Sequence, residues 1–321
     1  MSGGARAFWM ASPGRGEIRT QSVPDPSNDE VLVRTLHSGV SRGTETLVFS
    51  GGVPPSQHDA MRAPYQEGDF PAPVKYGYLN VGVVEHGPAS LQGRTVFSLY
   101  PHQTRYVVPA SAVTVVPDDV PPARAVLAGT VETAVNAVWD AAPLIGDRIA
   151  VVGGGMVGCS VAAVLAGLPG ARVQLVDVDP SRATLAAALG VGFASPADAL
   201  GDCDVVIHAS ATSAGLARSL ELLATDATVV ELSWYGDRPV TVPLGEFFHS
   251  RRLTVKSSQV GGIPPGRRRT YAERLALALD LLKDARFDAL ITGSCDFAEL
   301  PDVLPRLADG SLPALCHLVN Y

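Results

Sequence analysis

A glycine-rich segment in the middle of the chain places the strongest constraint on its fold. The letters IAVVGGGMVG, from Ile149, run from an apolar stretch rich in β-branched residues into glycines. Gly153, Gly155 and Gly158 have the G-x-G-x-x-G spacing, in which the first glycine makes a tight turn, the second lets backbone approach a pyrophosphate, and the third lets a helix pack closely on a strand. The helix N-terminus offers unpaired N–H groups and a partial positive charge to phosphates. The segment therefore predicts a dinucleotide site; a ligand-free glycine turn and an FAD site are the alternatives.

The segments around this motif alternate between helix-like and strand-like patterns, as in parallel βαβ units. Before residue 125, short alternating runs such as VLVRTL, from Val31, are separated by Gly and Pro clusters. The sequence thus predicts an α/β fold in which a β-rich domain precedes a doubly wound parallel sheet. Strands are expected at 148–152, 172–176, 204–208, 228–232, 253–257 and 316–319, and helices at 123–141, 157–167, 180–189, 215–223, 246–252 and 270–283.

Composition excludes several classes of protein. The 321 residues carry a formal net charge of −7, whereas nucleic-acid binders use basic residues to contact phosphates. No stretch approaches the roughly 20 apolar residues of a membrane helix, and the N-terminal letters lack the apolar core of a signal peptide. The four cysteines lie far apart without a CxxC pair, as in a reduced cytoplasmic protein. We therefore expect a cytoplasmic protein with a small-molecule substrate, and neither nucleic-acid nor membrane partners.

An acidic residue follows the glycine motif at the distance that a ribose contact requires. Asp177 comes 19 residues after Gly158, at the end of the next expected strand. Its carboxylate is placed to accept hydrogen bonds from both adenosine ribose hydroxyls and would repel a 2′-phosphate, so NAD(H) is favoured over NADP(H). Arg182, five residues further on, is able to accommodate a phosphate, and NADP(H) therefore stays open as the less favoured cofactor.

Three segments resemble the medium-chain dehydrogenase/reductase family. SGVSRGTE, from Ser38, is similar to the segment that carries the first zinc cysteine; GYLNVGVVEHG, from Gly77, resembles a G-H-E-x-x-G-x-V motif; and GDRIAVVGGGMVG, from Gly146, resembles G-D-x-V-x-V-x-G-x-G-x-x-G. The resemblance extends over nearly the whole chain. It implies a GroES-like catalytic domain at 1–124, completed by 261–321, a Rossmann domain at 125–260, and a homodimer.

The sequence departs from this family at the zinc ligands. Ser41, Tyr78 and Ala128 stand where the resemblance places the three ligands, and a hydroxyl, a phenol and a methyl do not hold Zn²⁺. Glu45 and Glu132 are potential oxygen ligands, but two carboxylates without Cys or His make a poor zinc site. We therefore expect no metal.

Without zinc, another group must stabilise the charge that develops on a carbonyl oxygen as hydride arrives. The resemblance makes Tyr78 the candidate general acid, Ser41 or Thr44 part of a relay, and Glu132 a proton carrier or substrate anchor. The plainer alternatives are packing for Tyr78, a turn or cap for Ser41, and a favourable helix-start charge for Glu132. Structural roles are expected for Tyr76, His37, His102 and His208. The expected cofactor contacts are Gly153, Gly155, Met156, Val157, Gly158, Asp177, Arg182, Ala209, Ser210 and Ser233.

These observations predict a zinc-independent NAD(H)-dependent oxidoreductase that transfers hydride between nicotinamide and a small organic alcohol, ketone or enone. One alternative is an NADPH-dependent quinone or enone reductase. The other is a nucleotide-binding protein without turnover. A weaker resemblance, carried by Val131–Ala141 and the SRGTE letters from Ser41, is to the branch containing bacteriochlorophyllide hydroxyethyl dehydrogenases. It does not define a substrate.

Overall fold

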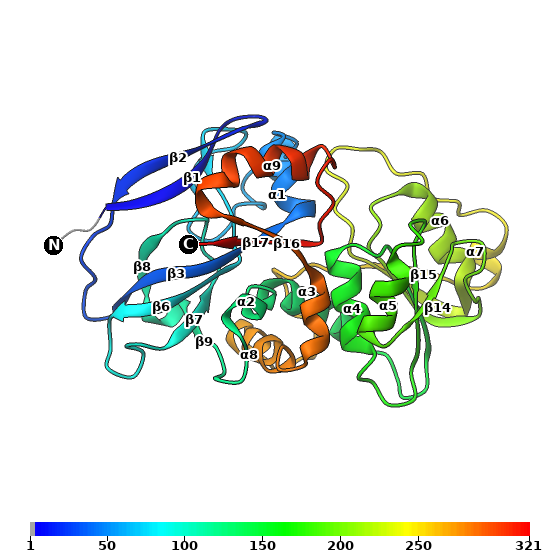
Figure 1. Ribbon diagram of the computed structural model, residues 1–321. Coiled ribbons are helices and arrows are strands. Elements are labelled where there is room, and N and C mark those ends of the chain that lie inside the picture. The colour runs from blue at the N-terminus through cyan, green and yellow to red at the C-terminus, as the bar shows by residue number, and fades with distance from the viewer. Residues whose placement is uncertain (1–3) are drawn as a thin grey trace. The chain divides into compact units, whose positions relative to one another are not determined.

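The computed structural model describes residues 4–321, which divide into two compact units (Figure 1). The first unit contains the residues up to Gly129 together with Ile291–Tyr321, and the second contains Thr130–Leu290. The sequence-based boundary at 124/125 lies five residues earlier than this division. The larger difference concerns residues 261–290, which were expected in the first unit and lie in the second. The reason is that the helix Tyr271–Leu281 carries the buried Arg274, whose guanidinium bonds to Glu132 and Asn136 of the second unit.

The first unit is built on two β-sheets. The larger has the order β16-β17-β3-β6-β7-β9, with β8 also paired to β3, and the smaller has the order β2-β1-β5-β4. The strands are β1 Gly4–Ser12, β2 Arg15–Ser22, β3 Glu30–Ser41, β4 Glu67–Gly68, β5 Val74–Lys75, β6 Asn80–His86, β7 Thr95–Ser98, β8 Arg105–Pro109, β9 Thr114–Val115, β16 Ile291–Asp296 and β17 Cys316–Asn320. The helices of more than three residues are α1 Arg42–Phe49, α2 Pro122–Ala125 and α9 Leu300–Ala308.

Strand β3 is the central element of the larger sheet. Val31 and Val33, two positions apart, point into a buried cluster that also contains Val84 and Tyr106, as the alternation of a strand requires. Strand β17 pairs antiparallel with β3, so that Cys316 lies opposite Ser41. The C-terminal segment thus returns to the first unit and holds the end of β3 where α1 begins.

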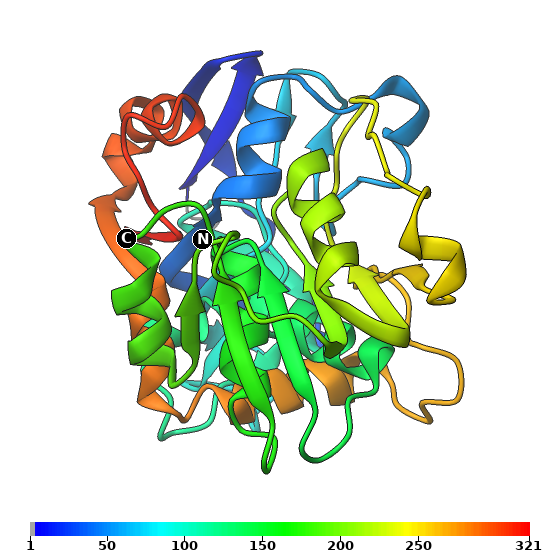
Figure 2. The ribbon, with the colours of Figure 1, turned by 90° about the vertical axis from the view of Figure 1, so that its right-hand side faces the viewer.

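The second unit is a six-stranded parallel sheet of order β12-β11-β10-β13-β14-β15. Figure 2 shows green and yellow-green strands of this sheet lying side by side. Its strands are β10 Arg148–Val152, β11 Arg172–Val176, β12 Gly192–Ala194, β13 Cys203–His208, β14 Leu223–Glu231 and β15 Thr254–Ser257. Its helices are α3 Ala128–Ala141, which starts at the boundary, α4 Met156–Leu165, α5 Arg182–Leu189, α6 Ser213–Leu222, α7 Phe247–Ser250 and α8 Tyr271–Leu281.

The strand order reverses at β10, because the chain moves outward to β11 and β12 and then crosses to β13 on the other side. Right-handed connections therefore put α4 and α5 on one face and α6 on the other. This is the doubly wound arrangement, whose ligand crevice lies beyond the carboxyl ends of the strands at the reversal. The expected strands 148–152 and 172–176 coincide with β10 and β11. The helix expected at 123–141 is interrupted by a turn at 126–127 and forms α2 and α3.

Candidate functional site

The glycine motif joins β10 to α4, and each of its glycines has a distinct environment. Gly153 has φ of 111°, in the region that favours glycine, and a Cβ there would lie 2.6 Å from the backbone nitrogen of Ser210. A Cβ on Gly158 would lie 1.9 Å from the carbonyl oxygen of Gly153, so a side chain would push the helix off the strand. At Gly155 a Cβ would meet no atom of residues 4–321 within 4 Å. The loop therefore leaves open space at the N-terminus of α4, where a pyrophosphate would bind, and Met156 and Val157 are in the first turn of that helix.

Asp177 lies directly after β11 and faces this loop. Its Oδ2 accepts a hydrogen bond from the Gly154 N–H at 2.5 Å, and its Oδ1 accepts one from the Asp179 N–H at 2.8 Å. A Cβ on Gly154 would lie 3.1 Å from Asp177 Oδ2 and 3.2 Å from Arg182 Cγ, so both side chains lie over the loop. Arg182 Nε is 3.4 Å from Asp179 Oδ2. A carboxylate oxygen accepts more than one hydrogen bond, and Asp177 therefore retains acceptor capacity for ribose hydroxyls. These residues fit a dinucleotide.

A polar cluster that the sequence analysis did not predict lies at the carboxyl ends of β13 and β14. His208 and Glu231 are direct neighbours in the strand pairing, and His208 Nδ1 is 2.7 Å from Glu231 Oε2. The His208 side chain is fully buried. Burial raises the pKa of Glu231, but the hydrogen bond and charge of His208, with bonds from Ser233, more than offset this, so the pKa lies below its usual value. The sequence carried a signal for this pair, because His208 and Glu231 lie at or next to the ends of two consecutive expected strands.

Two of the predicted cofactor contacts belong to this cluster. Ser210 Oγ is 2.7 Å from His208 Nε2, and the N–H of Ser233 donates to Glu231 Oε1 at 2.7 Å. Ser233 Oγ in turn accepts from the N–H of Ala211 at 3.0 Å. Ala209, the third predicted contact on this side, donates its N–H to the carbonyl of Val152 at 2.8 Å, next to the glycine loop.

Tyr78 lies in the loop between β5 and β6 of the first unit and is half-buried. Burial, followed by the nearby charge of Glu45, raises the pKa of Tyr78 to about 12, while hydrogen bonds with Ser41 and Thr44 lower it. The structure thus brings together three of the side chains for which the resemblance implied proton chemistry. At neutral pH the phenol is protonated, so it is suited to donate a proton rather than to accept one.

A second hydrogen-bond network that the sequence did not predict includes Glu45, whose charge acts on Tyr78. Glu45 and His102 are both buried, with Glu45 Oε2 2.8 Å from His102 Nε2. His102 Nδ1 is 2.6 Å from Ser38 Oγ, which is 2.9 Å from the hydroxyl of Tyr321. Glu45 Oε1 also accepts from the N–H of Ser41 at 2.7 Å. No short motif connects these residues, which come from three separate parts of the chain, and no sequence signal could have found the network.

Glu132 is engaged by an arginine that the sequence analysis did not consider. Arg274 Nε donates to Glu132 Oε1 at 3.1 Å, and the two side chains are 2% and 7% exposed. Burial raises the pKa of Glu132, whereas the charge and hydrogen bond of Arg274 lower it, and the net direction is upward. Arg274 also bonds to Asn136 Oδ1 at 2.5 Å. This geometry favours a fixed polar anchor over a proton carrier.

Residues 4–321 show neither a metal cluster nor a membrane-spanning helix. No group of three or more His, Cys, Asp or Glu residues in that range is arranged to hold a metal ion. Within the same range, no helix has both the length and the apolar character needed to cross a bilayer.

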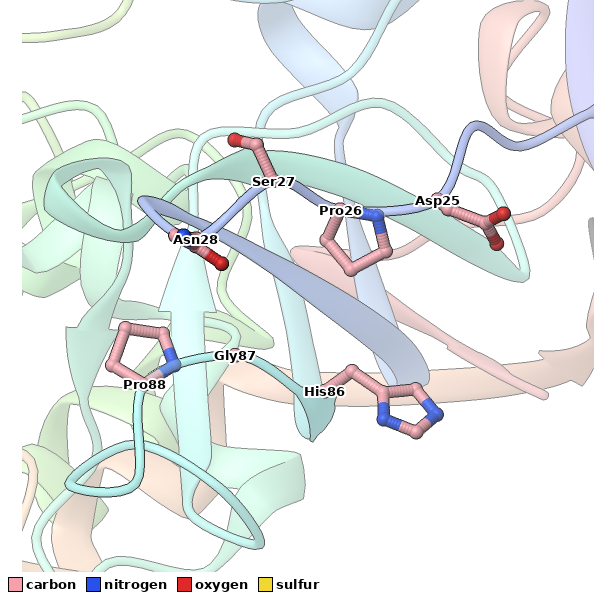
Figure 3. Close-up of a pocket in the computed structure, with 7 residues that line it drawn as sticks. All are labelled: Asp25, Pro26, Ser27, Asn28, His86, Gly87 and Pro88. Atoms are coloured by element: carbon pink, nitrogen blue, oxygen red, sulfur yellow. The ribbon is translucent and has the colours of Figure 1, made fainter.

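A hollow of about 630 Å³ in the first unit is lined by two segments, 25–28 between β2 and β3 and 86–88 at the end of β6 (Figure 3). Asp25 and His86 supply its titratable side chains. The lining contains none of the predicted site residues, so we assign the hollow no role in the proposed function.

Comparison with solved structures finds the same fold in proteins described as dehydrogenases. L-idonate 5-dehydrogenase from Escherichia coli K-12 superposes with a TM-score of 0.83 at 16% identity, covering 100% of this chain and 99% of that one. A protein described as a short chain alcohol dehydrogenase from E. coli CFT073, solved with NADH, gives 0.79 at 17% identity and 100% coverage of both chains. A candidate zinc-binding dehydrogenase of Sinorhizobium meliloti 1021, solved with NADP, gives 0.78 at 18% identity, covering 99% of this chain and 100% of that one.

No family model matches the sequence, and no curated protein matches it. At identities below 20% the structural likeness shows the fold. The expected two-domain α/β fold, with a β-rich domain and a doubly wound parallel sheet, is thereby confirmed.

Proposed function

We propose that this chain, which has the two-domain fold of the dehydrogenases above, is an NAD(H)-dependent oxidoreductase of the medium-chain type that acts on a small organic alcohol, ketone or enone without zinc. One observation carries the proposal. The glycine loop lies at the strand reversal of a parallel sheet, with open space at Gly155 and the Asp177 carboxylate bonded to the loop backbone. The family resemblance then favours hydride transfer over binding alone.

The preference for NAD(H) over NADP(H) rests on Asp177. A phosphate on the adenosine 2′-oxygen would meet the negative charge of Asp177, whereas a free hydroxyl would donate to it. Arg182 favours the alternative, an NADPH-dependent quinone or enone reductase, because its stem lies beside Asp177 over Gly154. We expect NAD(H) to prevail because Arg182 Nε is already 3.4 Å from Asp179. Direct titration with NADH and NADPH decides between them.

The residues present do not fit zinc, so no step of the proposed reaction uses a metal. NAD(H) supplies or accepts the hydride when it is bound. As the carbonyl carbon of the substrate gains hydride, its oxygen gains negative charge, and Tyr78 donates a proton to that oxygen. An alkoxide is a stronger base than a phenolate whose conjugate acid has a pKa of about 12, so this transfer is downhill. Ser41 and Thr44 hold the phenol in place.

A panel of ketones, aldehydes and enones with NADH, followed at the nicotinamide absorbance band, tests this function. Steady NADH consumption with at least one carbonyl supports it. NADH binding without consumption of any panel member favours the nucleotide-binding alternative. Homodimer formation and a cytoplasmic location remain predictions, the first to be measured by sedimentation of the purified protein.

A further inference from the structure

A glutamate–histidine pair in the second unit, with the histidine buried and the glutamate half-buried, contacts a hydroxyl beside the dinucleotide loop. Glu231 Oε2, His208 and Ser210 Oγ form a continuous chain with two contacts of 2.7 Å. The Ser210 backbone packs against Gly153, because a Cβ on that glycine would lie 2.6 Å from Ser210 N. Ser210 itself is half-buried, whereas His208 is not exposed at all. The imidazole is therefore inside the protein, and Ser210 is at the edge of the proposed cofactor crevice.

The hydrogen bonds hold the Ser210 hydroxyl in a fixed position. A carboxylate only accepts hydrogen bonds, and the pKa of Glu231 lies below its usual value, so the proton between Glu231 and His208 is on Nδ1. The other nitrogen, Nε2, contacts Ser210 Oγ at 2.7 Å, and a hydroxyl is able to donate or accept there. The His208 ring, held by Glu231, therefore fixes the position of the Ser210 hydroxyl.

The remaining contact of Ser210 is with Thr212. Thr212 Oγ1 lies 2.9 Å from Ser210 Oγ and accepts from the N–H of Gly215 at 3.0 Å. A hydroxyl has one donor and two acceptor sites, and within the described residues these contacts use two of the three. One site is left with which Ser210 is able to bind a ligand.

Gly215, in the first turn of α6, keeps room for this arrangement. A Cβ at this position would lie 2.1 Å from Ser210 Oγ and 2.9 Å from His208 Nε2. Any other residue would displace the hydroxyl from the imidazole.

The topology of the sheet shows which half of the cofactor would meet Ser210. Asp177 follows β11 on one side of β10, and Ser210 follows β13 on the other. A dinucleotide lies across the strand reversal with its pyrophosphate at the glycine loop. If Asp177 holds the adenosine ribose, the nicotinamide riboside is on the side of β13 and β14.

We propose that Glu231 acts through His208 to orient the Ser210 hydroxyl as a hydrogen-bonding partner for the nicotinamide riboside half of the cofactor, whose ribose hydroxyls and carboxamide both donate and accept hydrogen bonds. Glu231 and His208 are positioning residues. The inference rests on the proposed function, because it requires that the crevice bind NAD(H).

Binding of NADH and of ADP to the full-length protein tests the inference, because ADP lacks the nicotinamide riboside. Ser210→Ala should weaken NADH about 10-fold, the effect of one strong hydrogen bond, and leave ADP within about twofold. Glu231→Gln should act in the same direction on NADH alone. The double variant should bind NADH within about twofold of Ser210→Ala, because both changes act on the same hydroxyl.

Ser219→Ala is the matched control. Ser219 is a buried serine on α6 whose hydroxyl donates to a carbonyl of the same helix at 2.8 Å, and its loss should change neither affinity. Equal weakening of ADP and NADH in the Ser210 variant, or unchanged NADH affinity, would overturn the inference and leave the proposed function intact. A wild-type protein that binds neither ligand would overturn the proposed function, and the inference with it. Ser210→Ala changes a half-buried position, so the test does not depend on the fold tolerating a change at Glu231.

Discussion

Replacing Arg274 by methionine should destabilise the second unit strongly. The guanidinium donates to Glu132 at 3.1 Å, to Asn136 at 2.5 Å, and to the carbonyls of Gly262 and Val260 at 3.0 and 2.5 Å. Methionine fills much of the volume but leaves a buried carboxylate without its cation. Breaking a buried ion pair from one side costs about 3–5 kcal/mol. For a unit of the size of Thr130–Leu290, each kcal/mol shifts Tm by about 2–4 °C, so we expect the Tm of the second unit to fall by roughly 10 °C.

The pH dependence of this loss identifies its cause. The folded-state pKa of Glu132 is already raised by burial, and removing Arg274 raises it further. Between the unfolded and folded pKa values the native state binds the extra proton, so the stability of the variant increases as pH falls. We therefore expect the deficit relative to wild type to shrink from pH 7 towards pH 5. Denaturant unfolding at several pH values measures this.

The control is the double variant in which Glu132→Gln accompanies Arg274→Met. It removes the buried charge and should recover most of the lost stability. The ion-pair reasoning would be refuted by a single-variant loss below about 1 kcal/mol at pH 7, or by a deficit that grows as pH falls.

Three further predictions concern the proposed reaction. Tyr78→Phe should reduce kcat by about 100-fold with NADH affinity unchanged; turnover at the wild-type rate on the true substrate would show that the phenol only packs. Asp177→Ser should narrow or reverse the preference for NADH over NADPH, since the negative charge is lost; tighter NADPH binding by the unaltered protein would contradict the role of Asp177. Elemental analysis should find no stoichiometric zinc, and chelators should leave activity unchanged; one zinc per chain, with activity lost on chelation, would direct attention to Glu45 and Glu132.

Local sequence patterns predicted the ends of helices and strands in the second unit only where a glycine, a proline or a capping residue stands at the end of the element. Strand β10 was predicted at both ends because β-branched residues stop at the glycine motif. Strand β14 was expected to start at residue 228 and starts at Leu223, because α6 ends at Leu222 and passes into the strand without a Gly or Pro between them. The helix α8 was expected to start at Thr270, which is its N-cap in a capping box with Glu273. Its assignment to a unit depends on Arg274 reaching Glu132, 142 positions away, which no local pattern shows.

The same distinction applies to the candidate site. Asp177 could be predicted because a fixed spacing relates it to the glycine motif. Glu45 and His102 are 57 positions apart, and Ser38 and Tyr321 are 283 apart. These pairs exist only because antiparallel strands and loops of the first unit bring them together. Buried polar networks of this kind are properties of the packed fold, so sequence reasoning treated His102 as an isolated residue.

The return of β17 to β3 makes the order of synthesis matter for the first unit. The whole of the second unit, Thr130–Leu290, is translated between the two parts of the first. At about 5–20 residues per second, that takes roughly 8–30 s. During this time β3 has partners in β6 and β8 but not in β17. An unpaired strand edge is a template for association with other chains, so nascent chains halted within the second unit should be more prone to aggregation than finished ones. The second unit is continuous in sequence, so it is able to complete its sheet before β16 and β17 of the first unit have been synthesised.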